Sequence, residues 1–223
     1  MNTPKIKHRA RISVLILAAG EGRRMGGRAK CLLDVQGQSL LERLMGLIHS
    51  EGFHSCVLVL GFYACDIQAH LKQWPAHLVP RQVINLSPGD DPASSLHIGL
   101  RALDSDTQAV MVMLADQPLI NATDIGSVCA AFHSCLPNCH ALVPLVNGVP
   151  GHPVIFDASV RIDLLASPGT SLRQWVANHP NESVKWVVDN PHYISDLDTP
   201  DDIEELVRKT GWIINWPISQ MLE

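Results

Sequence analysis

A segment rich in glycine and basic residues near the N-terminus carries the clearest chemical signal. Between residues 20 and 30 the chain places four glycines and four cations: Gly20, Gly22, Gly26, Gly27, Arg23, Arg24, Arg28 and Lys30. Glycines let backbone N–H groups approach a polyphosphate, and the basic side chains neutralise its charge. Because an apolar run at 13–18 precedes the segment, we expect a phosphate-binding loop at the carboxyl end of a buried strand.

Two common phosphate loops do not fit this spacing. A G-x-G-x-x-G loop requires glycine at position 25, where the chain has Met25. A G-x-x-x-x-G-K-[ST] loop requires lysine and then a hydroxyl residue after Gly27, where Arg28 and Ala29 follow. The remaining alternative, a glycine turn with solvated arginines, leaves the concentration of glycines and cations unexplained.

A carboxylate follows a second apolar run. The string M-L-A-D-Q-P at 113–118 delivers Asp116 at the end of the run 109–114. Mg²⁺ binds one or two carboxylates together with phosphate oxygens and water, so Asp116 is a candidate metal ligand beside the glycine loop. A turn or capping role for Asp116 is the structural alternative.

These residues must be positioned by alternating strands and helices. We expect buried strands at 13–18, 56–60, 82–86, 109–114, 141–146 and 184–188, and helices at 39–51, 65–72, 94–103, 123–135 and 170–178. This order predicts an α/β domain with three layers and a mostly parallel sheet covered on both faces. Residues 154–156 are expected to pair with 141–146 as a hairpin.

The C-terminal part of the chain contains a well-marked helix and an apolar extension. Thr199 is a predicted cap, Pro200 occupies the first helical position, and Gly211 ends the helix. The extension at 211–223 contains the apolar stretch W-I-I-N-W-P, which we expect to pack back on the domain. We therefore predict a basic flexible tail at 1–11, one domain at 12–210 and this extension.

Composition restricts the class of protein. The 223-residue chain is 46% hydrophobic and carries a formal net charge of −5, so a broad nucleic-acid-binding surface is not expected. No apolar run approaches the roughly 20 residues that span a bilayer, so no membrane partner is expected. The six cysteines lie mostly in apolar segments of a chain too large to need disulfides, which favours reduced thiols and a cytoplasmic location.

A cluster of potential zinc ligands needs a separate explanation. It comprises Cys129, His133, Cys135, Cys139 and His140. Cys129 and His133 share a face of a predicted helix, but the C-x-x-C pairs typical of zinc sites are missing. An amphipathic helix with small buried thiols is the preferred interpretation.

The string L-A-A-G-x-G-x-R-M-G-G-R-x-K-x-L-L closely resembles the signature of the MobA-like nucleotidyltransferases, the family of the molybdenum-cofactor enzymes. L-A-D-Q-P resembles the family's metal motif, and the resemblance covers most of residues 12–207. It implies a Rossmann-like nucleotide-diphospho-sugar transferase fold. It also implies that Arg24, Lys30 and Asp116 are catalytic, and that nucleotide is bound by Leu17, Ala18, Ala19, Gly20, Gly22, Arg24 and Lys30.

Three further segments acquire roles from this resemblance. D-L-D-T-P at 196–200 resembles the place where a second carboxylate approaches the metal; Asp198 is preferred, and Asp196 stays open because alternate residues of an extended segment face opposite sides. Ser94 and Ser95 resemble a serine-rich helix start near the base or sugar, although they would cap a helix in any case. Gly151 and His152 resemble the family's G-H-P segment near the acceptor, although a structural role for a histidine at a strand start is the alternative.

The resemblance implies transfer of a nucleotidyl group with Mg²⁺ as cofactor. The loop start L-A-A-G resembles the cytidylyl branch of the family, whereas the guanylyl branch usually has L-A-G-G. The resemblance therefore makes CTP the expected nucleotide. It makes molybdopterin, as molybdenum cofactor, the expected acceptor. A molybdoenzyme or its maturation chaperone is a possible partner. The alternatives are a guanylyl-, sugar-phosphate or alcohol-phosphate nucleotidyltransferase, a redox enzyme of the same family, and a non-catalytic cofactor carrier.

Overall fold

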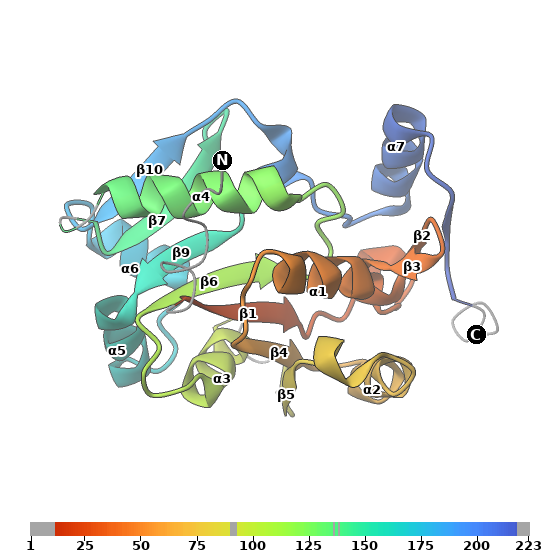
Figure 1. Cartoon of the computed structure of the whole chain (residues 1–223), viewed down its shortest axis with the longest axis horizontal. Coiled ribbons are helices and arrows are strands. Elements are labelled where there is room, and N and C mark those ends of the chain that lie inside the picture. The colour runs from red at the N-terminus through yellow and green to blue at the C-terminus, as the bar shows by residue number, and fades with distance from the viewer. Residues whose placement is uncertain (1–11, 90–92, 136, 138, 218–223) are drawn as a thin grey trace.

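A mostly parallel sheet forms the centre of the structure, a computed structural model that describes residues 12–89, 93–135, 137 and 139–217 (Figure 1). Its eight strands run in the order β10-β7-β9-β6-β1-β4-β5, with β8 paired to β7. The strands are β1 (Ile12–Ala18), β4 (Cys56–Leu60), β5 (Arg81–Ile84), β6 (Ala109–Leu114), β7 (Ala141–Val146), β8 (Val149–Pro150), β9 (Val154–Asp157) and β10 (Ser183–Val187).

Seven α-helices and short 3₁₀ turns connect these strands within the described residues. The α-helices are α1 (Leu40–Ser50), α2 (Ala64–Leu71), α3 (Ser94–Ala102), α4 (Ala122–Cys135), α5 (Ala158–Ala166), α6 (Leu172–Asn178) and α7 (Pro200–Thr210). The 3₁₀ turns are η2 (Arg23–Met25), η3 (Lys30–Leu32), η4 (Ala76–Leu78) and η5 (Pro191–Ile194). None of the helices among these residues is long and apolar enough to span a membrane.

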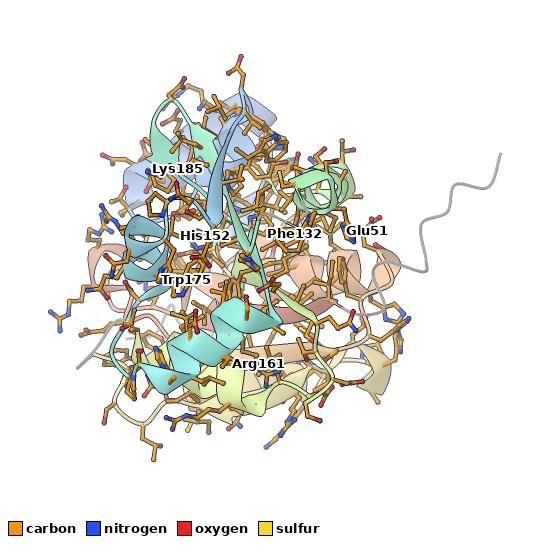
Figure 2. The ribbon with its side chains drawn as sticks, turned by 90° about the vertical axis from the view of Figure 1, so that its left-hand side faces the viewer. Glu51, Phe132, His152, Arg161, Trp175 and Lys185 are labelled. Atoms are coloured by element: carbon orange, nitrogen blue, oxygen red, sulfur yellow. The ribbon has the colours of Figure 1, made fainter. Side chains whose placement is uncertain are left out.

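Alternation along β1 creates two cores and thereby three layers. Val14 and Ile16 face α1, α2 and α4, whereas Leu15 faces α3, α5 and α6. Figure 2 shows the two sides through Phe132 of α4 and Trp175 of α6, which lie on opposite faces of the sheet. The predicted three-layer α/β fold with a mostly parallel sheet is therefore confirmed.

The carboxyl ends of β1, β4, β5 and β6 meet at one edge of the sheet. β1 pairs in parallel with β4 and β6, and β4 pairs in parallel with β5. The glycine segment after Ala18 and the L-A-D-Q-P segment after Leu114 are consequently neighbours, as the strand pattern predicted.

The strand β9 interrupts the parallel order. It pairs antiparallel with β7, as the predicted hairpin requires, but it also pairs antiparallel with β6 and so lies between the two. The tight hairpin is formed instead by β7 and β8, whose turn places Asn147 and Gly148 at positive φ. A two-residue turn of this kind favours Asn-Gly, which was the available sequence signal.

Several boundaries differ from the sequence prediction. β5 covers 81–84 rather than 82–86, and β10 covers 183–187 rather than 184–188. α6 begins at Leu172 because Ser171 and Gln174 form a capping box there, so the predicted start at 170 was too early. Helix α5 was missed; Asp157 caps it by accepting from the N–H groups of Ser159 and Val160.

A second, small sheet lies beyond the carboxyl edge of the large one. It consists of β2 (Asp34–Val35), β3 (Gln38–Ser39) and β11 (Ile214–Asn215), all antiparallel. Figure 1 shows β2 and β3 with α7 beyond the end to which the β1 arrow points. The part of the C-terminal extension that the structure describes therefore packs back on the domain, as predicted. The predicted basic tail at 1–11 lies outside the described residues.

The core beneath α5 provides a test of this packing. Phe156 of β9 is fully buried, whereas Ile162 of α5 is 65% exposed. We expect Phe156→Ala to lower the free energy of unfolding by about 3–5 kcal/mol, because the large ring leaves a cavity. Ile162→Ala, the control, should change it by less than about 0.5 kcal/mol. Equilibrium urea denaturation measures both; similar values for the two variants would contradict the assignment of this core.

Candidate active site

The glycine loop has a backbone conformation that only glycine accommodates at its centre. Gly22 has a φ of +62°, and its carbonyl accepts hydrogen bonds from the N–H groups of Met25 (2.8 Å) and Gly27 (3.1 Å). A Cβ at Gly22 would collide with the carbonyl oxygen of Arg28. Met25 is buried and anchors the loop to the domain. The loop is therefore a closed turn whose two sides touch.

The loop is also fastened to the first turn of α2. The Tyr63 hydroxyl donates a 2.7 Å hydrogen bond to the carbonyl of Glu21, and the Glu21 carboxylate pairs with Arg23. Gly61, the residue after β4, lies against Ala19 at the start of the loop. A Cβ at Gly61 would collide with the Ala19 backbone. The residues that follow β4 therefore position the start of the glycine loop.

The Lys30 ammonium joins the loop to two carboxylates from distant parts of the chain. Its Nζ lies 3.1 Å from Oδ2 of Asp116 and 2.5 Å from Oδ1 of Asp198. The other oxygen of Asp198 accepts from Arg24 at 2.6 Å. Arg24 is 68% exposed, whereas the side chains of Lys30 and Asp116 are only 19% and 22% exposed. Four of the predicted site residues therefore form one charge cluster.

Burial and charge shift the protonation equilibria of this cluster. Burial lowers the pKa of Lys30, but the attraction of Asp116 and Asp198 outweighs burial, so the pKa is raised and the ammonium is retained. Burial raises the pKa of Asp116 by more than Lys30 lowers it. The hydrogen bond from Lys30 holds the pKa of Asp198 below its usual range. Asp116 and Asp198, which share the Lys30 ammonium, therefore have pKa values shifted in opposite directions, because Asp116 is the more deeply buried of the two.

A third carboxylate lies close to the cluster but has a different partner. Nε2 of Gln117 donates to Oδ1 of Asp196 (2.7 Å) and to the carbonyl of Tyr193 (3.1 Å). Burial and the charge of Asp116 raise the pKa of Asp196. Leu197, which lies between Asp196 and Asp198 in the chain, donates its N–H to the carbonyl of Asp116 at 3.0 Å. The D-L-D-T-P turn is therefore bonded directly to the end of β6.

A cleft of about 180 Å³ opens above the cluster. Eight predicted site residues line it: Leu17, Ala18, Gly20, Gly22, Arg24, Lys30, Asp116 and Asp198. Sequence reasoning missed two cleft residues that follow β4: Tyr63, which precedes the first residue of α2, and Ile67 within α2. The predicted residue Ala19 does not line the cleft; it is buried against Gly61.

One of the loop cations does not face the cleft. Arg23, Arg24 and Lys30 line it, but Arg28 lies with its guanidinium 5.1 Å from the ring centre of Trp216 in the C-terminal extension. The charge of Arg28, which was not among the predicted site residues, therefore interacts with an indole ring.

The predicted serines lie at the same sheet edge, outside the cleft lining. Ser94 and Ser95 begin α3, and both hydroxyls accept hydrogen bonds from the Asn85 amide, at 2.8 and 2.9 Å. The N–H of Asn85 in turn donates to the carbonyl of Leu60 at the end of β4. Asn85 therefore fixes the start of α3 relative to the sheet, a role that a lone asparagine after a strand does not reveal in the sequence.

Gly151 and His152 lie at the start of β9, also outside the cleft lining. The His152 N–H donates to the carbonyl of Tyr193 at 2.8 Å, and a Cβ at Gly151 would collide with that residue. Burial lowers the pKa of His152 to about 4, so its imidazole is neutral at physiological pH. Figure 2 shows His152 between the sides marked by Trp175 and Phe132.

The cysteines are free thiols, and all six lie within the described residues. Burial raises the pKa of Cys31, next to Lys30, to about 12, so this thiol stays protonated at neutral pH. Among residues 12–89, 93–135, 137 and 139–217, no group of three or more His, Cys, Asp or Glu side chains is arranged to hold a metal. A metal at the Asp116 carboxylate would therefore take its further oxygen ligands from water or from a bound substrate.

Known protein families include one whose sequence pattern matches most of this chain. A model described as the MobA-like NTP transferase domain matches residues 14–184. The chain belongs to this family. A nicotine blue oxidoreductase from Paenarthrobacter nicotinovorans is 26% identical over 204 residues, covering 86% of this chain and 92% of that protein. A molybdenum cofactor cytidylyltransferase from Escherichia coli is 37% identical over 68 residues, covering 30% of this chain and 34% of that protein.

Solved structures agree with the fold. Rv0371c from Mycobacterium tuberculosis superposes with a TM-score of 0.73 at 22% identity, over 89% of this chain and 99% of that one. A manganese complex of Rv0371c gives 0.68 at 23% identity, over 90% and 100%. The 4-diphosphocytidyl-2C-methyl-D-erythritol synthase of Anaerococcus prevotii gives 0.69 at 18% identity, over 91% and 99%. The chain thus has the fold of nucleotidyltransferases.

The closed turn at Gly22 can be tested with a matched pair of glycine substitutions. Gly22 and Gly26 both have positive φ, but a Cβ at Gly26 meets no atom within 4 Å. We expect Gly22→Ala to weaken nucleoside triphosphate binding by roughly tenfold or more, since a forced backbone shift costs about 1–3 kcal/mol. Gly26→Ala carries similar φ strain without the collision and should weaken binding less. Titration calorimetry measures both, and equal losses would contradict the proposed geometry.

Proposed function

We propose that this protein transfers a cytidylyl group from CTP to the phosphate of molybdopterin, as molybdenum cofactor, and releases pyrophosphate. The observation that carries the proposal is the cluster of Lys30, Asp116 and Asp198 beneath the glycine loop. It combines cations for a polyphosphate with carboxylates for a divalent metal in one half-buried place.

The residues of the chain have distinct roles in this reaction. An oxygen of the acceptor phosphate attacks the α-phosphorus of the nucleotide, and the bond between the α-phosphorus and the bridging oxygen of the β-phosphate breaks. Lys30 and Arg24 hold the leaving pyrophosphate, while backbone N–H groups from Gly20 to Gly22 orient it. The negative charge is spread over oxygens, so fixed cations supply most of the stabilisation and no protein nucleophile is needed.

The carboxylates fit a magnesium ion that binds together with the nucleotide. The Asp116 side chain is 22% exposed, and burial raises its pKa by more than the neighbouring Lys30 lowers it. Mg²⁺ is commonly held by one or two carboxylates and by substrate phosphates, which matches a site with few protein ligands. Asp116 would hold the ion, with Asp198 as the preferred second carboxylate and Asp196 as the alternative. When bound, the ion would supply charge stabilisation at the phosphates.

The choice of nucleotide and acceptor rests on the sequence of the loop and on one relative. The L-A-A-G start of the loop favours cytosine, and one curated relative is a molybdenum cofactor cytidylyltransferase, although the match covers 30% of this chain. Ala18 and Ala19 are assigned to the base, and Ser94 and Ser95 to the base or sugar. The G-H-P segment, with Gly151 and His152, is assigned to the acceptor. A molybdoenzyme or its maturation chaperone would then receive the product.

A second candidate function is supported by the relative from Paenarthrobacter nicotinovorans. This relative, named an oxidoreductase, matches 86% of the chain. The glycine loop lacks the dinucleotide fingerprint because Met25 replaces the required glycine. Binding of a reduced nicotinamide or flavin nucleotide in preference to a nucleoside triphosphate would favour the redox function over the transfer reaction.

A substrate screen tests the proposed function directly. We expect pyrophosphate release with CTP that requires both Mg²⁺ and molybdopterin, and at least about tenfold lower release with ATP, GTP or UTP. Pyrophosphate is measured by a coupled assay, with NAD(P)H and flavin binding followed in parallel by fluorescence. Preference for GTP would assign the guanylyl branch, a sugar phosphate acceptor another branch, and no turnover with any triphosphate would refute the transfer reaction.

Removal of the carboxylate at the end of β6 tests the mechanism. We expect Asp116→Ala to lower kcat/KM by at least about 100-fold, because metal-based stabilisation of the transition state is worth several kcal/mol. Asp106→Ala, which removes an exposed carboxylate outside the cleft lining, is the matched control and should leave kcat/KM unchanged. Turnover is measured over a Mg²⁺ titration. If Asp116→Ala retains both turnover and its metal dependence, the mechanism is wrong.

A further inference from the structure

The C-terminal segment Trp212–Pro217 contacts the nucleotide loop and the helix behind it. Arg28 of the loop lies 5.1 Å from the ring centre of Trp216, and Arg43 of α1 lies 4.9 Å from that of Trp212. Both distances fall within the range of a cation–π interaction. Two tryptophans of one short segment therefore each bind an arginine near the site.

Backbone pairing fixes this segment to the chain that follows Lys30. β11 pairs with β2, with Ile214 opposite Val35 and Asn215 opposite Asp34. The carbonyl of Ile213 also accepts from the Gln36 N–H at 2.9 Å. Lys30 is the first residue of η3, and β2 begins at Asp34, shortly after that turn. The C-terminal segment is therefore paired with backbone that lies only a few residues from Lys30.

The same segment contributes to the core beneath the second carboxylate. A cluster of buried residues contains Leu33, Val35, Leu40, Leu197 and Leu206, and Trp212, Ile214 and Trp216 pack against it. Leu197 stands between Asp196 and Asp198 and is 3% exposed. One apolar cluster thus supports both sides of the charge cluster, the loop and the D-L-D-T-P turn.

We propose that Trp212–Pro217 is a positioning element for the nucleotide loop, with Trp216 as its positioning residue. Trp216 holds the Arg28 side chain away from the cleft while the Arg28 carbonyl lies against Gly22, so the closed form of the loop is maintained before nucleotide binds. The proposal rests on the proposed nucleotide binding of the same loop.

The kinetic test compares Trp216→Ala, Trp216→Phe and Arg28→Ala with the wild type. Loss of this partly exposed cation–π contact should raise the KM for CTP by roughly 2- to 5-fold and leave kcat unchanged. Trp216→Phe retains a ring and should restore most of the affinity. The double variant Trp216→Ala/Arg28→Ala should be no weaker than either single variant, since both remove one contact. Additive losses would overturn the proposal.

The control variant lies in the same segment. Ile213 is 66% exposed, and its carbonyl bond to Gln36 does not depend on the side chain. Ile213→Ala should leave both KM and kcat at wild-type values. An equal rise of KM in this variant would show that any change in the segment perturbs the loop, and would overturn the specific role of Trp216.

Hydrogen exchange of the protein without nucleotide separates this proposal from the proposed function. Trp216→Ala should accelerate exchange of amides at 22–35 by roughly the same 2- to 5-fold and leave those of β1 and β6 unchanged. Unchanged exchange at 22–35 would overturn the proposal even if the enzyme is active. If the wild type transfers no nucleotide, the proposed function fails, and the exchange result still decides whether Trp216 orders the loop.

Discussion

The ammonium of Lys30 between Asp116 and Asp198 is the interaction on which the site depends. It joins three segments that are far apart in the chain: the glycine loop, the end of β6 and the turn before α7. A half-buried charge group of this kind is stable only when every member has partners, since desolvation otherwise costs several kcal/mol. The fold meets this condition because the parallel strands bring the glycine loop and the end of β6 to one edge of the sheet. The apolar cluster that contains Leu33 and Leu197 holds the turn before α7 against them.

Much of the fold and part of the site could be predicted because their signals are contiguous in the sequence. A glycine loop directly after an apolar strand, and an aspartate directly after another, must lie at the same edge of a parallel sheet. The family match and the structure confirmed the family and the three-layer architecture that these signals predicted. The individual roles of Arg24, Lys30, Asp116 and the other site residues stay predictions, although eight of these residues line one cleft.

The features that sequence reasoning missed depend on contacts between distant segments. Asn85 binds both Ser94 and Ser95, and Gln117 binds Asp196, but neither side chain has a local pattern that announces its partner. The pairing of Arg28 with Trp216 likewise joins the two ends of the domain. Helix α5 escaped notice for a different reason, because its short sequence A-S-V-R-I-D-L-L-A has only two fully buried positions, Val160 and Leu164.

One backbone atom connects the G-H-P segment with Gln117 and Asp196 at the end of the charge cluster. The carbonyl of Tyr193 accepts from the His152 N–H and from the Gln117 amide, and the same amide holds Asp196. The Tyr193 hydroxyl is in turn bound to the carbonyl of Asp124 in α4, so this atom is fixed by the core. A shift of the G-H-P segment would therefore change the hydrogen bonds of Gln117, which follows Asp116 in the chain and binds Asp196.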